Sequence, residues 1–193
     1  MREIELKAHV RDLERTLSCF RSYLGEGKEV HKKDTYLRRP GEKIQSMRIR
    51  KFPERLEVTT KQNSRKEGLE DNSEYEFSVP LEEYDKAILF FNALGHEYFF
   101  TKEKDGYEWQ DGDAHIELLE VNDLGWFLEI EVLLPFTSSD DDAGRAREEI
   151  LALFGKAGIE NCDIEEKAYR DMILGGDHGV QGEPYTGEGQ RHS

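Results

Sequence analysis

The sequence predicts an α+β fold in which about eight antiparallel strands form a barrel or tunnel with a charged interior and helices packed outside. Two patterns predict this fold. Charged and apolar residues alternate along one segment after another, and other segments carry an apolar stripe at helical spacing. Charged residues make up 36% of the chain, against roughly 25% in an average domain. A fold for this chain must therefore accommodate an unusual number of charges.

Helices are predicted where apolar residues recur on one side of a segment. These segments are 12–24, 80–94, 139–157 and 164–174. Gly25 follows the first, as is common after a helix, and Pro80 opens the second. The third begins in the acidic run 140–142, which favours a helix N-terminus. Asp163 is expected to cap the fourth.

Most of the remaining chain alternates with a period of two, so successive side chains would point to opposite faces of a strand. In residues 3–8, Glu3, Glu5 and Lys7 share one face and apolar residues occupy the other. The pattern recurs at Arg48 and Arg50, Thr59 and Lys61, Glu74 and Glu76, Lys102 and Lys104, His115 and Glu117, and Glu129 and Glu131. The strands are therefore predicted to carry charged faces of mixed sign.

The connections and the domain limits follow from composition. Turns are expected at 39–41 and 52–54, and the polar segment 62–73 is expected to be a long exposed loop. Residues 1–175 are predicted to form one domain. Residues 176–193 are polar and glycine-rich, and are expected to be a disordered tail.

The apolar strand faces match the apolar stripes of the predicted helices. Helices would therefore cover the outside of a curved sheet and leave its charged faces inside. Burying an ion away from water costs several kcal/mol, so such an interior would have to be wet. The alternative is an open antiparallel sheet with one face in water.

Charge and composition exclude several classes of function. The net charge of −15 disfavours binding to nucleic acid or to an anionic membrane surface. No apolar run approaches the length of a membrane helix, and the N-terminus has no signal-peptide pattern. Cys19 and Cys162 lie far apart and have no CxxC pairing. We therefore expect a cytoplasmic protein with reduced thiols.

Charges of both signs on one surface favour a particular chemistry. Lysine and arginine clusters bind phosphate, and arginine can donate two hydrogen bonds to it. Carboxylate clusters without cysteine or a paired-histidine spacing favour hard cations such as Mg²⁺ or Mn²⁺. Together they indicate a polyphosphate bound with its metal.

An ordered set of short motifs resembles a known family. Glu3-Ile4-Glu5-Leu6-Lys7 opens the chain. It is followed by K-D-T-Y-L at 33–37, R-I-R at 48–50, Lys61, E-Y-E at 74–76, K-E-K at 102–104, L-G-W-F-L-E-I-E at 124–131 and A-Y-R at 168–170. In this order the motifs resemble those of the CYTH superfamily, the triphosphate tunnel metalloenzymes. The resemblance covers about residues 2–175 and looks most like the class IV adenylyl cyclases.

The resemblance implies roles for individual residues. The metal ligands would be Glu3, Glu5, Glu129 and Glu131. The phosphates would be held by Lys7, Arg48, Arg50, Lys61, Lys102 and Lys104, and Lys7 would also serve catalysis. Leu119 stands where the cyclases carry a metal-binding Asp, and Glu117 or Glu120 is the candidate replacement.

The resemblance also implies three alternative functions. The leading hypothesis is an adenylyl cyclase that converts ATP into cyclic AMP and pyrophosphate with Mg²⁺ or Mn²⁺, and that pairs as a homodimer. The second is a hydrolase of inorganic triphosphate, thiamine triphosphate or a similar compound. The third is a non-catalytic module that binds a nucleotide or polyphosphate.

Overall fold

The computed structural model describes residues 2–41, 47–66 and 69–175, with the backbone alone for the part of 61–74 that it covers. The predicted tail at 176–193 lies outside the described residues. The strands are β1 (Arg2–His9), β2 (Lys28–Arg38), β3 (Met47–Lys51), β4 (Arg55–Lys66), β5 (Leu69–Pro80), β6 (Glu97–Asp111), β7 (Ala114–Val121) and β8 (Trp126–Leu134). The helices are α1 (Leu13–Leu24), η1 (Leu81–Glu83), α2 (Tyr84–Ala93), α3 (Asp140–Lys156), η2 (Asn161–Asp163) and α4 (Tyr169–Gly175).

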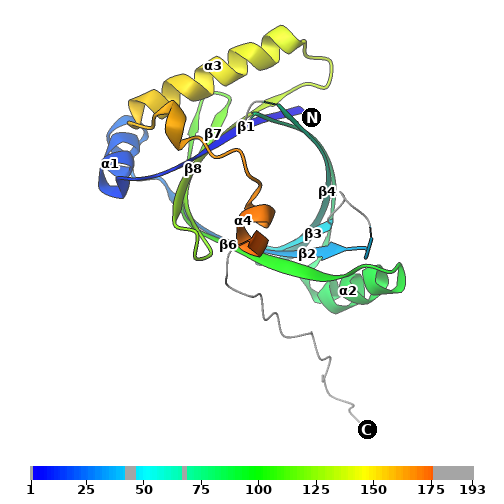
Figure 1. Cartoon of the computed structure of the whole chain (residues 1–193). Helices are drawn as coiled ribbons and strands as arrows, with labels where there is room; N and C mark the ends of the chain where they lie inside the picture. Colours follow the sequence, from blue (N-terminus) through cyan, green and yellow to red (C-terminus); the bar gives the residue numbers. More distant parts are fainter. Residues whose placement is uncertain (1, 42–46, 67–68, 176–193) are drawn as a thin grey trace.

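The strands form a closed antiparallel barrel in the order β1-β5-β4-β3-β2-β6-β7-β8, with β8 paired back to β1. Figure 1 looks along this ring and shows α1 and α3 on one side of it and α2 on the opposite side. The predicted α+β barrel with outer helices is therefore confirmed. Closure also removes the sheet edges at which another strand could pair.

The apolar strand faces lie under the helices. On β1, Ile4 and Leu6 are buried in one cluster with Ile150 and Phe154 of α3 and Phe20 of α1. A second cluster packs Ile88 and Phe91 of α2 against β2, β3 and β4. Because alternate residues of a strand point to opposite faces, the charged residues of these strands are directed into the barrel.

Three helices start close to their predicted positions. The Asp12 side chain accepts a hydrogen bond from the Arg15 N–H at 3.0 Å and caps α1. Ser139 and Asp142 form a reciprocal capping box at the start of α3. The predicted 80–94 helix opens with the 3₁₀ turn η1 before it continues as α2.

The predicted fourth helix is wrong over its first half. Ile164 forms an isolated bridge with Ala8, and the Glu165 N–H donates to the Lys7 carbonyl at 2.9 Å. This segment is therefore held extended along β1, and the helix begins only at Tyr169. Asp163 accepts from the Glu160 N–H and so caps η2 instead.

The predicted loop at 62–73 is also wrong over its described residues, 62–66 and 69–73. The backbone continues β4 and β5, with Gln62 opposite Ser73 and Arg65 opposite Glu70. Backbone hydrogen bonds do not require apolar side chains, so the ladder begun at Val58 and Phe77 extends through the polar segment. The turn predicted at 52–54 does connect β3 to β4, and residues 39–41 directly follow β2. Among the described residues, no helix combines the length and apolar character needed to cross a membrane.

Candidate active site inside the barrel

Strand register brings charged residues from distant parts of the sequence into rows. Lys7 lies opposite Glu129, Glu129 opposite Glu117, and Glu117 opposite Glu108, across four neighbouring strands. The next row joins Glu5, Glu131 and His115 in the same way. The alternation seen in each segment therefore becomes a carboxylate-rich wall on β1, β6, β7 and β8.

Three predicted metal ligands meet on this wall. Glu3, Glu5 and Glu131 each offer a carboxylate oxygen, and these oxygens lie within 4.8 Å of one another. Burial alone would raise the pKa of Glu131, but hydrogen bonds with His115 and Glu3 outweigh burial and lower it. A group of carboxylate oxygens fits a hard divalent cation such as Mg²⁺ or Mn²⁺. The donor set therefore suits the predicted cation.

Glu129 is not part of this group. Lys104 donates to both its carboxylate oxygens, at 2.8 and 2.6 Å, and the Tyr169 hydroxyl donates to Oε1 at 2.5 Å. Both Lys104 and Glu129 are buried. Burial opposes both charges, but the charge of Lys104 lowers the pKa of Glu129 and the charge of Glu129 raises the pKa of Lys104. The two residues therefore remain an ion pair.

Glu117 lies apart from the first group as well. It gathers with Glu108 and His115, which the sequence did not single out as ligands. Lys32 bonds to Glu117, and Lys28 donates to Glu108 at 2.6 Å. Glu120, the other candidate replacement for a ligand at position 119, is exposed and on the outer face. Of the two, only Glu117 is directed into the barrel.

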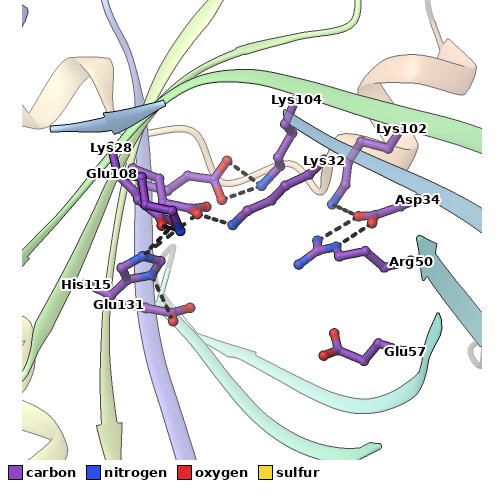
Figure 2. Close-up of polar contacts among 12 residues, drawn as sticks. Lys28, Lys32, Asp34, Arg50, Glu57, Lys102, Lys104, Glu108, His115 and Glu131 are labelled. Carbon is purple, nitrogen blue, oxygen red and sulfur yellow. Dashed lines mark hydrogen bonds and ion pairs between the residues drawn. The ribbon is translucent and has the colours of Figure 1, made fainter. Parts of the chain in front are cut away.

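The predicted phosphate-binding residues Arg50 and Lys102 meet at Asp34, which is fully buried. Arg50 donates two hydrogen bonds to its carboxylate, at 2.6 and 2.9 Å, and the Lys102 ammonium lies 3.7 Å from it. Figure 2 shows this group facing Lys104 and Lys32 across the interior. Burial alone would raise the pKa of Asp34, but Arg50 and Lys102 hold it well below its usual range.

Arg48 lies on β3 with Arg50, and together with Lys102 of β6 these residues form what we call the basic wall. The Arg48 Nη2 donates to Glu57 at 3.2 Å and to the Thr59 hydroxyl at 2.9 Å. Its Nε is buried and has no hydrogen-bond partner among the described residues. An orphaned buried N–H of an arginine fits an anionic ligand, because leaving it unpaired costs free energy. The side chain of Lys61 lies outside the described residues, although its backbone continues β4 two positions after Thr59.

One end of the interior contains an apolar cluster that includes α4. Tyr169 is buried with Leu119, Val121 and Phe127. Its ring lies 5.0–5.4 Å from the ammonium groups of Lys7, Lys102 and Lys104, and in Figure 1 α4 is drawn within the ring of strands. Burial first, and then the negative charge of Glu129, raise the pKa of the Tyr169 hydroxyl well above its usual value. Tyr169 therefore remains a hydrogen-bond donor in this apolar layer.

Sequence reasoning assigned no role in the site to several interior residues. Asp34 and Lys32 share a strand face by period-two spacing, a signal that was available in the sequence. Glu108 and His115 are separated by a turn, and only the β6–β7 hairpin register brings them together. Tyr169 belongs to the A-Y-R motif, but that motif could not predict its bond to Glu129, which lies 40 positions away in the sequence.

A surface hollow of about 430 Å³ lies apart from this site. Its lining residues come from β2, β6, β7 and β8 and include Glu29, His31, Asp105, Tyr107, Glu120 and Trp126. The lining side chains of β2 and β6 alternate with those directed inward, so the hollow is on the outer side of the barrel wall. We therefore assign the candidate active site to the interior charges.

Comparisons with known proteins agree with the geometry. The chain resembles the PH1012 protein from Pyrococcus horikoshii OT3, with 25% identity and a TM-score of 0.72 over 88% of this chain and 98% of that one. A candidate adenylate cyclase from Vibrio parahaemolyticus has 17% identity and a TM-score of 0.69, covering 89% and 97%. HpAC1 from Hippeastrum, a candidate adenylyl cyclase with a dominant triphosphatase activity, has 15% identity and a TM-score of 0.61, covering 90% and 96%.

A search of curated proteins found no match. The family profile described as the CYTH domain matches residues 1–169, which span the whole barrel and the first residue of α4. A charged, closed barrel and a profile match over most of the chain lead to one conclusion: the protein belongs to the CYTH domain family.

Proposed function

We propose that the protein is a divalent-cation-dependent enzyme that breaks a phosphoanhydride bond of a triphosphate bound inside the barrel. One observation carries the proposal: Arg48, Arg50 and Lys102 form a basic wall, and Glu3, Glu5 and Glu131 form a carboxylate group on β1 and β8, across the closed barrel from β3. Figure 2 shows Arg50 and Lys102 on the opposite side of the interior from Glu131. A triphosphate needs both kinds of partner, because its oxygens attract basic groups and also bind a cation that the carboxylates can hold.

The basic side chains would bind the phosphoryl oxygens. The two bonds from Arg50 to Asp34 fix the plane of its guanidinium and leave further N–H donors for a phosphate. The orphaned Nε of Arg48 is a donor of the same kind. These groups are held in place before substrate binds, so little reorganisation would be needed as negative charge develops on the leaving group.

Glu3, Glu5 and Glu131 would hold Mg²⁺ or Mn²⁺. Such a cation withdraws charge from phosphoryl oxygens and so makes phosphorus easier to attack. Lys7 is a buried cation of β1 within the carboxylate-rich wall, opposite Glu129 in the β1–β8 ladder and 5.3 Å from the Tyr169 ring. We assign Lys7 the role of orienting the attacking oxygen against the bound triphosphate.

Cyclisation of ATP is the first candidate reaction. The ribose 3′-oxygen would attack the α-phosphorus and lose its proton, and the bond to the β-phosphate would break to release pyrophosphate. The K-D-T-Y-L run at 33–37 and the L-G-W-F-L-E-I-E run at 124–131 support this choice, because both look like those of class IV adenylyl cyclases.

Hydrolysis is the second candidate. In that reaction water attacks a phosphorus and the phosphoanhydride bond beyond it breaks. Leu119 favours it, because the residue in the place of the cyclases' metal-binding Asp is fully buried in the Tyr169 and Phe127 cluster. That end of β7 therefore supplies no cation ligand at position 119.

A product assay tests the proposal. Purified protein would be incubated with Mn²⁺ and either ATP or inorganic triphosphate, and the products separated by chromatography. Cyclic AMP with pyrophosphate identifies the cyclase, and orthophosphate released mainly from inorganic triphosphate identifies the hydrolase. If neither substrate is converted although ATP binds, the enzyme proposal is wrong and a binding module is favoured.

A matched pair of arginine variants tests the basic wall. Arg48→Gln should raise the KM at least ~10-fold, because a charge-assisted hydrogen bond to phosphate contributes about 1.5–3 kcal/mol. Arg38→Gln is the control, since Arg38 is exposed and lies over the Phe99 ring. Equal KM values for the two variants would show that the triphosphate does not bind to Arg48 of the basic wall.

A further inference from the structure

A second group of cation ligands lies beside the first on the same wall. Glu108 of β6 and His115 and Glu117 of β7 each offer one ligand atom, and these atoms lie within 4.8 Å of one another. Glu117 is buried, and the other two are partly buried. Unlike the group at Glu3, this one includes a nitrogen donor.

The orientation of the histidine is a separate observation that points to a cation. His115 Nδ1 lies 3.3 Å from Glu131 Oε1, while Nε2 lies 3.5 Å from Glu108 and 3.9 Å from Glu117. When Nδ1–H donates to Glu131, the lone pair of Nε2 is directed toward both carboxylates. A carboxylate that fixes the tautomer in this way is typical of metal-binding histidines.

We propose that Glu108, His115 and Glu117 form a second divalent-cation site with one nitrogen and two oxygen donors. An imidazole ligand suits first-row transition ions, whereas Mg²⁺ favours oxygen ligands and geometry close to octahedral. The second site should therefore take Mn²⁺, and Co²⁺ or Ni²⁺ more tightly, in preference to Mg²⁺. The group at Glu3, Glu5 and Glu131 contains only oxygen donors and should accept Mg²⁺.

Two lysines compete for the second site. In the structure Lys28 donates to Glu108 at 2.6 Å (Figure 2). Lys32 bonds to Glu117. These ammonium groups balance the carboxylates, and a bound cation would take over that role. The Lys28 side chain is 77% exposed, so it can move into water at little cost.

Glu131 links the two sites. It belongs to the first ligand group, and it also orients His115 for the second. Binding of a cation at one site therefore changes the partner that supports the other. The proposal goes beyond the proposed function, because it holds whichever triphosphate reaction the protein performs.

Mn²⁺ binding followed by electron paramagnetic resonance tests the proposal without substrate. The wild type should bind about two equivalents of Mn²⁺, and electron spin-echo envelope modulation should detect a coordinated imidazole ¹⁴N. His115→Gln should lose one equivalent and the ¹⁴N signal. His31→Gln is the matched control, because His31 also pairs with a carboxylate, Asp105, but at the exposed outer face.

Two further variants distinguish Mn²⁺ binding at the second site from Mn²⁺ binding at the oxygen-only site. Glu3→Gln should weaken the oxygen-only site while the ¹⁴N signal persists. Lys28→Met should tighten Mn²⁺ binding at the second site a few-fold, because it removes a competing ammonium. Adding Mg²⁺ in excess should displace Mn²⁺ from the first site and leave the ¹⁴N-coupled ion in place.

The outcomes separate this proposal from the proposed function. A wild type without a ¹⁴N signal, or a His115→Gln variant that keeps both equivalents and the same signal, would overturn the second site. A ¹⁴N signal in a protein that converts no triphosphate would support the second site and contradict the enzyme proposal. A circular dichroism melt of each variant confirms that loss of binding is not loss of fold.

Discussion

Arg50 and Asp34 form a two-point ion pair between β3 and β2, in which Nε donates to Oδ1 at 2.6 Å and Nη2 to Oδ2 at 2.9 Å. Asp34 has no exposed side-chain surface, and Lys102 approaches its carboxylate from β6. One buried carboxylate therefore positions two residues that we assign to phosphate binding. Their placement depends on a residue that would not itself bind the phosphate.

Replacing Asp34 should be strongly destabilising. Asp34→Asn leaves the partly buried Arg50 and Lys102 charges without their counter-ion, which should cost about 3–5 kcal/mol. Urea unfolding followed by circular dichroism measures this free energy. Asp105→Asn is the control, because Asp105 is exposed and pairs with His31, and it should change stability by less than about 0.5 kcal/mol. Equal effects of the two substitutions would contradict the role of Asp34.

The Asp34 contribution should depend on pH in one direction. Its folded-state pKa lies well below its unfolded value of about 3.9, so the contribution is present above about pH 4 and is lost as pH falls below it. The stability gap between wild type and Asp34→Asn should therefore be constant from about pH 5 to 7 and shrink toward pH 2. Unfolding curves across this range measure the gap, and a gap that widens in acid would show the opposite sign.

Lys7 should be essential for turnover. Lys7→Met removes the buried charge opposite Glu129 on the carboxylate-rich wall, and should lower kcat by about 10²-fold or more. Lys33→Met is the matched control, because Lys33 is on an outer strand face and is paired with Glu103. Steady-state kinetics on the preferred triphosphate compares them. A folded Lys7→Met protein with unchanged kcat would show that Lys7 has no role in the reaction.

The Tyr169 hydroxyl should stabilise the attachment of α4. Tyr169→Phe removes the 2.5 Å hydrogen bond to Glu129 and should cost about 1.5–3 kcal/mol, the range for bonds to charged groups. Tyr98→Phe is the control and should change stability little, since Tyr98 is exposed and its hydroxyl contacts the uncharged Thr101 at 3.2 Å. Chemical unfolding distinguishes the two, and a neutral Tyr169→Phe variant would show that the bond does not hold α4.

A carboxylate at position 119 should not be tolerated. Leu119→Asp would place a charge in the apolar cluster with Tyr169 and Phe127, at a cost of several kcal/mol. Leu119→Met keeps the volume and polarity and should cost less than about 1.5 kcal/mol. Thermal unfolding measures both. A stable Leu119→Asp protein that gains cyclase activity would instead show that this position can serve the reaction.

Much of the fold was predictable because its pattern is local. The alternation in residues 3–8 is set by strand geometry alone, and the stripe of Ile150 and Phe154 by helix geometry alone. The loop prediction for residues 62–66 and 69–73 was wrong because their polarity is typical of a loop, whereas backbone pairing between the two halves of the hairpin makes them strands. The helix predicted from residue 164 was wrong over residues 164–168 for a similar reason. Ile164 and Glu165 bond to the backbone of β1 instead of starting a helix.

The site was predictable only in part. The sequence indicated which residues face the interior, including Glu3, Glu5, Glu129 and Glu131. It could not show that Glu129 pairs with Lys104 while Glu131 joins the carboxylate group, because spacing along one strand says nothing about the partner across the barrel.

By itself the sequence predicted the fold class, the charged strand faces and a resemblance to the family, because period-two alternation and ordered motifs are properties of neighbouring residues. The tertiary structure alone decided which charges meet. Barrel closure joins β1 to β8 and sets the register that brings His115 to Glu131, and the extended 164–168 segment carries Tyr169 to Glu129. These partners are set by strand order and chain reversal, which act between residues far apart in sequence.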